Sequence, residues 1–232
     1  DWARLAEGVR CRSEAAKMEV LSTGKMTVKE NGLNFSVDFG VPNGNTGFDI
    51  DVSTPDKNVL AQIEEIVETA RDKGFTVSGM VLSGSVLSKM LTNEGISKAI
   101  YGGAGAGAMV SRTQLVGLFN ELFGITEIRT NDLRYNVEGK DGKLTTQRFW
   151  GKSKVSFLAS YNGLQNFGVG LWGVTPEEEQ LGPWTAKSAE QFVTLTQWIE
   201  PDPTAVWSKA SGLFVPVLPN PAGLFIATAK LQ

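Results

Sequence analysis

Between Gly24 and Phe39 apolar and polar residues alternate, and this period of two gives a β-strand one apolar face. The Asn31-Gly32 pair in the middle tolerates the positive φ angles of a type I′ turn and therefore predicts a hairpin. The apolar positions of its two strands are Met26, Val28, Leu33, Phe35, Val37 and Phe39. Two strands alone are marginally stable in water, and residues 41–47 read as a loop rather than a third strand. We therefore predict that a neighbouring subunit covers the apolar face of this hairpin.

The clearest helical pattern runs from Pro55 to Lys73. Thr54 is a good N-cap, Pro55 fits the first helical position, and Gly74 ends the pattern. Residues 2–21 are also predicted to be helical, because they contain neither Pro nor a β-branched run. In the helix that starts at Pro55, apolar residues fall on a single stripe, at Val59, Leu60, Ile63, Ile66, Val67 and Ala70.

Shorter patterns complete the prediction and indicate an α+β fold. Residues 75–82 predict a strand, and Ser83 or Ser85 can cap a helix that runs through Leu91. Ser111, with Gln114 at the capping-box position, predicts a third helix that ends at Gly124. Helices in the middle of the chain and strands late in it are typical of α+β proteins. The late strands are predicted at 127–137, 148–159, 192–199, 206–218 and 224–229, whereas 96–110 and 160–183 read as Gly-rich loops.

The composition is that of a globular protein with one large domain or two small ones. The chain has 232 residues, of which 41% are hydrophobic and 20% charged, with a net charge of −3. No basic patch favours sequence-specific nucleic-acid binding, and no apolar run approaches the roughly 20 residues of a membrane span. The sequence contains no His, which removes the Ser-His and Cys-His nucleophile systems. The only cysteine, Cys11, is interpreted as a small helix residue, and the mid-helix start at Asp1 predicts a fragment without its natural N-terminus.

Four further patterns suggest chemistry, and for each one the structural interpretation is preferred. The Gly-rich loop 102–107 lacks the Gly-Lys-Ser/Thr ending of a phosphate-binding P-loop. Asp49 and Asp51 could hold Mg²⁺ only with further oxygen ligands, and acidic residues ahead of a helix are favourable without a metal. The Glu177–Glu179 run offers no acid/base pair without a partner. We predict no enzyme, cofactor or metal, and packing explains the late tryptophans more simply than a sugar-binding platform: Trp150, Trp172, Trp184, Trp198 and Trp207.

Three segments resemble the major capsid proteins of tailed bacteriophages, in particular the lambda-type family (gene product E). The first is EAAKMEVLSTGKMTV, where a helix joins the predicted hairpin. The second is TPDKNVLAQIEEIVETARDKG followed by FTVSGMVLSGSVLSKML, which resembles the long spine helix of that family and the strand after it. The third is EPDPTAVWSKASGLFVPVLPNPAGLFIATAKL, which resembles the family's C-terminal strands. Their order and spacing extend the resemblance over nearly the whole chain.

The resemblance implies the Hong Kong 97-like capsid fold. The hairpin would be the extended loop that lies across a neighbouring subunit. The Gly-rich segment would be an axial loop, with Gly102, Gly103, Gly105 and Gly107. The implied division of the chain is an N-terminal helix at 1–23 after a missing arm, the extended loop at 24–47, a peripheral domain at 48–74 and 188–218, an axial domain at 75–187, and a C-terminal strand at 219–232.

The function that the resemblance implies is that of a structural subunit of a phage or prophage capsid. Such subunits assemble into hexamers and pentamers that enclose double-stranded DNA without sequence specificity. The implied partners are other copies of the chain and scaffolding, portal and decoration proteins, with no membrane. The implied location is the virion, and the host cytoplasm before assembly. Two alternatives stay open: an encapsulin-like nanocompartment shell protein of the same fold, and a carbohydrate-binding protein.

Overall fold

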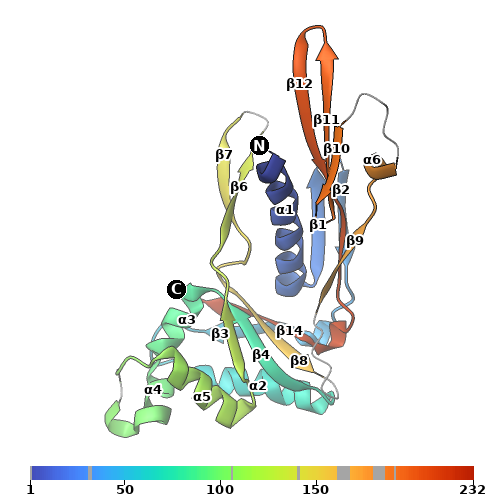
Figure 1. Ribbon diagram of the computed structural model, residues 1–232. Coiled ribbons are helices and arrows are strands. Elements are labelled where there is room, and N and C mark those ends of the chain that lie inside the picture. Colours follow the sequence, from blue (N-terminus) through green and yellow to red (C-terminus); the bar gives the residue numbers. More distant parts are fainter. Residues whose placement is uncertain are drawn as a thin grey trace. The chain divides into compact units, whose positions relative to one another are not determined.

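The computed structural model describes residues 2–30, 33–105, 107–139, 142–160, 168–179, 186–190 and 192–232. Its elements form a mixed α+β fold, as the sequence predicts (Figure 1). The chain divides into a smaller unit, Asp1–Lys17 with Gly168–Val217, and a larger unit, Met18–Phe167 with Leu218–Gln232. The helices are α1 (Trp2–Thr23), α2 (Val59–Asp72), α3 (Gly84–Leu91), α4 (Glu94–Tyr101), α5 (Arg112–Phe123) and α6 (Pro176–Glu179), with short 3₁₀ turns at Asn43–Asn45, Gly103–Gly105 and Pro221–Gly223.

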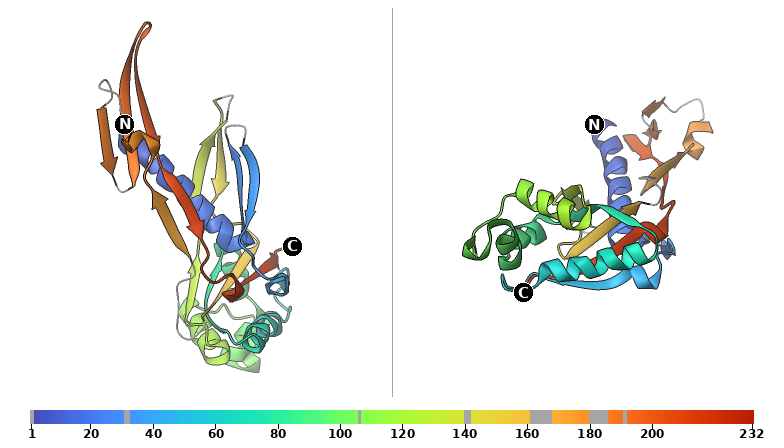
Figure 2. Two further views of the ribbon diagram at one scale, coloured as in Figure 1. Left: turned by 90° about the vertical axis from the view of Figure 1, so that its right-hand side faces the viewer. Right: turned by 90° about the horizontal axis from the view of Figure 1, so that it is seen from below.

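The larger unit is built on a five-stranded sheet. Its strands β14–β3 and β4–β5 are parallel pairs, whereas β8 is antiparallel to both of its neighbours. Helices α2 to α5 lie together on one face of this sheet (Figures 1 and 2), and their apolar side chains form the main core with those of the strands. The order across the sheet is β3 (Thr46–Asp51), β14 (Leu224–Lys230), β8 (Lys154–Ser160), β4 (Thr76–Leu82) and β5 (Glu127–Thr130).

The last turns of α1 cover part of the opposite face of the same sheet. Val20 packs with Leu224 and Ile226 of β14 in a second buried cluster. The buried Ser156 hydroxyl donates a hydrogen bond to the carbonyl oxygen of Leu21 at 2.7 Å. This bond satisfies one of the carbonyl groups that every helix leaves free at its C-terminal end. The central strands β8 and β14 are therefore buried on both faces.

Two hairpins extend the larger unit. The first consists of β1 (Lys25–Glu30) and β2 (Leu33–Asp38), and the second of β6 (Arg134–Glu138) and β7 (Leu144–Arg148). Asp132 fixes the base of the second hairpin, because its carboxylate accepts from the backbone N–H of Gly84 at 2.9 Å and pairs with Arg148 at 3.1 Å.

The smaller unit contains a three-stranded sheet and a two-stranded ribbon. The sheet has the order β10 (Ala186–Glu190), β11 (Val193–Pro201), β12 (Thr204–Ser211). The ribbon pairs β9 (Val169–Gly173) with β13 (Leu213–Val217). The first part of α1 packs on this unit through Ala6, which is buried together with Val193 and Leu195. Trp172 and Phe214 pack with their ring centroids 4.8 Å apart.

The predicted helix start at Thr54 and Pro55 is wrong, because α2 begins only at Val59. Asn58 is the N-cap, and its side chain accepts from the N–H of Ala61 at 3.2 Å. The buried Asn93 side chain explains the difference. Its amide donates to the carbonyl oxygens of Pro55 and Lys57, at 2.8 Å each, and holds the preceding residues in a turn. This contact joins residues more than 30 positions apart, so local patterns could not indicate it.

A second prediction is wrong in part, because the first residues of the predicted Gly-rich loop at 96–110 belong to helix α4. Asn93 caps it by accepting from the N–H of Ile96 at 3.1 Å. Ile96 and Ser97 are buried on its inner side. By contrast, α5 matches its prediction: Ser111 and Gln114 form a complete capping box, and Gly124 ends the helix in the left-handed conformation.

Three of the long predicted strands are broken in the structure. Residues 127–137 divide into β5 and β6, because the Asn131 side chain accepts from the N–H of Leu133 and turns the chain. Residues 148–159 contain only the end of β7 and most of β8, and residues 206–218 divide into β12 and β13. The segment expected to be irregular contains β9.

The compact units are described by their own contacts, and the domain division that the resemblance implies stays a prediction. Helix α2 packs in the core of the larger unit beside β3 and β4. The partner of residues 188–217 within their unit is the first part of α1. The positions of the apolar residues account for these contacts: the buried face of α2 meets the five-stranded sheet, whereas Ala6 meets β11.

A buried polar contact holds the C-terminal strand in place and gives a test of the fold. The Asn45 side chain is fully buried, donates to the carbonyl of Ala222 at 2.7 Å, and accepts from the Lys73 ammonium group. We expect Asn45→Ala to lower the free energy of unfolding by about 1–3 kcal/mol, because it leaves buried polar groups without partners. The exposed Asn43→Ala is the control and should change it by less than about 0.5 kcal/mol. Urea denaturation followed by circular dichroism measures both, and equal effects would contradict the assignment.

Candidate subunit interface

The register of the β1–β2 hairpin places its apolar residues on one face, as the sequence predicts. Met26 lies opposite Val37, and Val28 lies opposite Phe35. Directly opposed residues of an antiparallel pair share a face, so these four side chains form one apolar surface and the polar residues form the other. The turn, Asn31-Gly32, and the side chain of Leu33 lie outside the part of the chain that the structure describes.

The base of the hairpin is anchored in the larger unit. Met26 and Phe39 pack against the buried cluster that contains Val20. Gly24 starts the hairpin with a φ of +73°, and a Cβ there would lie 2.8 Å from Cγ2 of Val41. The N–H of Thr27 donates to the Glu19 carboxylate at 3.0 Å. The first strand is therefore tied to the end of α1 at the point where the hairpin leaves the core.

The apolar face further along the hairpin has a different environment. Phe35 is 47% exposed and Val37 37% exposed, and neither belongs to a core cluster of the described residues. Val28 is half-buried. Of the predicted interface residues, the structure thus uses Met26 and Phe39 in its own core and leaves Phe35 and Val37 available. Their contact with another subunit stays a prediction.

The predicted axial loop lies elsewhere in the larger unit. It follows α4 on the helical face of the sheet, whereas the hairpin begins at the end of α1. Gly102, Gly103 and Gly107 are exposed, but Gly105 is fixed. Its carbonyl accepts from the Ser97 hydroxyl, and a Cβ on it would collide with Cβ of Tyr101. The loop is therefore anchored at one glycine and exposed at the others.

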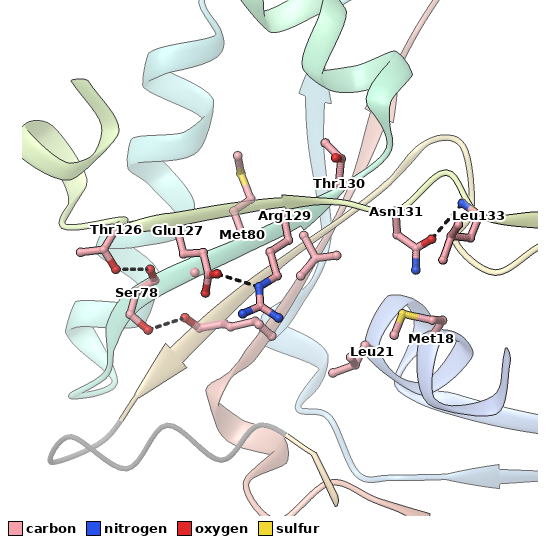
Figure 3. Close-up of a pocket in the computed structure, with 13 residues that line it drawn as sticks. Met18, Leu21, Ser78, Met80, Thr126, Glu127, Arg129, Thr130, Asn131 and Leu133 are labelled. Atoms are coloured by element: carbon pink, nitrogen blue, oxygen red, sulfur yellow. Dashed lines mark hydrogen bonds and ion pairs between the residues drawn. The ribbon is translucent and has the colours of Figure 1, made fainter. Parts of the chain in front are cut away.

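A groove of ≈ 550 Å³ opens beside β4 and β5 in the same unit (Figure 3). Several of its polar side chains have partners within its walls. Glu127 pairs with Arg129 at 2.7 Å, and the Thr126 hydroxyl donates to the carbonyl of Ser78 at 3.1 Å. Leu158 is one of its apolar lining residues. The groove presents a mixed surface whose polar groups hold the strands together, and the lining residues place no base beside a nucleophile.

Ion pairs and hydrogen bonds account for the Asp49–Asp51 pattern. Asp49 pairs with Lys230 at 2.9 Å, and this contact raises the pKa of the lysine. Asp51 accepts from the hydroxyl and the N–H of Ser53, which lowers its pKa. The two carboxylates thus serve separate partners. Within the described ranges no three His, Cys, Asp or Glu side chains are grouped so that they could hold a metal ion.

Structural contacts or burial account for the remaining chemical candidates that the structure describes. Glu177 forms an ion pair with Lys209, which lowers the pKa of Glu177 and keeps it ionised. Trp150 is fully buried, and its indole N–H donates to the carbonyl of Lys154 at 2.8 Å. Cys11 is half-buried, and burial raises the pKa of its thiol. Trp184 and the side chain of Glu179 lie outside the described residues.

Sequence reasoning missed exposed apolar residues on two further ribbons. On the β9–β13 ribbon Leu171 lies opposite Val215, and both are exposed. At the free end of the β11–β12 hairpin Trp198, Ile199, Val206 and Trp207 are exposed. The sequence contained one signal for them: Trp198-Ile199 is followed closely by the reversed pair Val206-Trp207. The sequence alone does not give the strand register, and it is the register that places Trp198 opposite Trp207 and Ile199 opposite Val206.

Comparisons with known proteins identify a similar fold. No model of a protein family matches the sequence, and no curated protein matches it. The structure is similar to a crystal structure described as "the putative capsid protein of prophage (E.coli CFT073)", with a TM-score of 0.61 and 15% sequence identity. The match covers 98% of this chain and 65% of that chain, so this chain spans just under two thirds of its neighbour's length. At this identity the likeness establishes the fold alone.

The ion pair at the base of the hairpin gives a pH-dependent test. Asp38 accepts from the N–H of Gly40 and pairs with Lys25, and both contacts lower its pKa below the ordinary 3.8. A lowered pKa stabilises the fold at pH values above the ordinary one, and this contribution is lost as the pH falls through the folded value. We expect Lys25→Met to raise the Asp38 pKa only in part, because the Gly40 contact remains. NMR titration of the carboxyl group measures this, and an unchanged pKa would contradict the pairing.

Proposed function

We propose that this chain is the structural subunit of a tailed-phage or prophage capsid shell with the Hong Kong 97-like architecture. The observation that carries the proposal is the fold similarity over 98% of the chain to the prophage protein described above. The capsid-type sequence segments, which point to the lambda-type family, support it independently. The role is structural rather than enzymatic, and it requires none of the nucleophile systems that need His.

The exposed face of the β1–β2 hairpin supplies the physical basis for assembly. Burying an exposed Phe or Val side chain stabilises a contact by about 1.5–3 kcal/mol at most. A shell repeats the same contact by symmetry, so a small gain in each subunit interface is multiplied over the whole particle. Phe35 and Val37 would provide this gain against a neighbouring copy, while the anchored base at Met26 keeps the hairpin in position.

The remaining partners follow from this role. Copies of the chain would form hexamers and pentamers that enclose double-stranded DNA, assisted by scaffolding, portal and decoration proteins. The net charge of −3 fits a shell that encloses DNA without gripping its phosphates. No helix in the described part of the chain is long and apolar enough to cross a membrane. The place of function would be the virion, after assembly in the host cytoplasm.

An encapsulin-like nanocompartment would use the same fold and the same interface. The two roles differ in contents, because one shell encloses a genome and the other encloses enzymes. Mass spectrometry of the material that co-purifies with particles distinguishes them. Scaffolding and portal proteins support the capsid role, and a cargo enzyme supports the alternative.

The hairpin gives the direct test of the proposed assembly. We expect the double substitution Phe35→Asp and Val37→Asp to block particle formation, because two carboxylates on the apolar face would have to be desolvated in the contact. The circular dichroism of the subunit should stay nearly unchanged, because both side chains are exposed. Electron microscopy of full-length protein expressed with its scaffold detects the particles.

A matched control places the same charges on the opposite face of the same strand. Asn34→Asp with Ser36→Asp adds two carboxylates beside the substituted positions, yet leaves the apolar face intact. Particles should still form. Equal loss in both double variants would show that charge on the strand, and not the apolar face, is responsible. Collapse of the subunit fold in the Phe35 and Val37 variant would also contradict the interface assignment.

A further inference from the structure

The free end of the β11–β12 hairpin exposes apolar side chains on both of its faces. Among the residues that the structure describes, the pairing of β10 with β11 ends at Gln197, and beyond it the described ribbon consists of β11 and β12. Figure 2 shows it extending past β10. In this two-stranded part Trp198 lies opposite Trp207 and Ile199 lies opposite Val206, with exposed fractions of 37%, 51%, 68% and 61% in that order.

The two faces differ in chemistry. The tryptophan face carries two stacked indole rings, with centroids 6.5 Å apart and an interplanar angle of 15°. The indole N–H of Trp207 donates to the Glu200 carboxylate at 2.7 Å, so the charge on this face has a partner. The aliphatic face, with Ile199 and Val206, is bordered by the uncharged pair Gln197 and Ser208.

This arrangement limits what can cover the hairpin end. A single flat surface would cover one face and leave the other in water. Since a fully buried Trp contributes about 150–250 Å² of contact surface, the exposed fractions correspond to roughly 200 Å² of surface on the tryptophan face. The two faces differ in chemistry, and the partner must supply surface on both sides of a thin ribbon.

We propose that the tryptophan face of one copy packs on the aliphatic face of the next copy. The inference rests on the proposed function, in which the chain assembles with itself. Because the two faces are unlike and point in opposite directions, the contact is heterologous and continues from copy to copy until a ring closes. Copies of this chain meet the requirement for two partner surfaces without any further protein.

The area explains why this contact is weak by itself and becomes strong only within a larger assembly. One such contact would bury on the order of 400 Å², well below the ~1,200 Å² at which specific protein interfaces become stable alone. The hairpin ends therefore associate weakly in solution. In a shell they gain strength, because other contacts already hold the copies together and raise the effective concentration of each face.

Two variants remove one face each while keeping strand-forming residues. The first combines Trp198→Thr with Trp207→Thr, and the second combines Ile199→Thr with Val206→Thr. We expect sedimentation velocity from about 10 µM to about 1 mM to show concentration-dependent association of the unmodified chain. Each variant alone should associate at least about tenfold more weakly. Leu144→Thr, which removes another exposed apolar side chain on β7, is the control and should behave like the unmodified chain.

An equimolar mixture of the two variants is the decisive measurement. Each mixed pair retains one intact contact, between the aliphatic face of the first variant and the tryptophan face of the second. We expect the mixture to form dimers and no larger species. The proposal is overturned if the mixture stays monomeric, if either variant alone associates like the unmodified chain, or if the unmodified chain stays monomeric throughout. If a double variant loses its β-strand circular dichroism, the single substitutions Trp207→Thr and Val206→Thr repeat the test.

Particle formation separates this inference from the proposed function. If the unmodified chain forms particles and both face variants form them equally well, the hairpin-end contact is wrong and the capsid role stands. If the unmodified chain forms no particles with its scaffold, the capsid role fails. The sedimentation mixture still decides the hairpin-end contact in that case.

Discussion

The fold depends on burying both faces of the strand β14 near the end of the chain. This strand lies between β3 and β8 in the five-stranded sheet. Phe225 and Ala227 join the main core with α2 to α5, while Leu224 and Ile226 pack with the end of α1 on the other face. The core therefore needs the first helix and the last strand together. The β1–β2 hairpin takes its position from the same cluster, because Met26 packs there.

The two-stranded ribbons outside this core are not buried on both faces. A ribbon of two strands has two faces and too few neighbours to cover both, so it gains little stability by itself. The hairpin end at Trp198 and the β1–β2 face at Phe35 leave apolar side chains in water. This exposure lowers the solubility of the isolated subunit and adds nothing to its folding stability. Such surfaces are physically reasonable in a chain whose working state is an assembly, and they agree with the proposed shell function.

Local chemistry predicted those parts of the structure that local contacts hold. The capping box at Ser111 needs only residues of its own first turn, and the hairpin register needs only the strands beside Asn31-Gly32. The start of α2 could not be predicted, because Asn93 draws the carbonyl of Pro55 into a long-range contact. The domain division that the resemblance implies stays a prediction, because it depends on contacts of the same long-range kind. The sequence shows that a helix has an apolar stripe, but the fold decides which sheet the stripe meets.

At the candidate interface, too, the sequence pattern predicted which residues share a face, but only the packing decides which of them are exposed. Alternation identified one face of the β1–β2 hairpin, yet only the packed structure separates the anchoring Met26 from the exposed Phe35. At the β11–β12 end, adjacent apolar residues lie on opposite faces, a pattern that resembles a strand buried on both sides. Burial on both sides is what the proposed ring would supply. Because each contact is weak alone, assembly would depend on several contacts forming together, and a misplaced copy would dissociate before the shell closed around it.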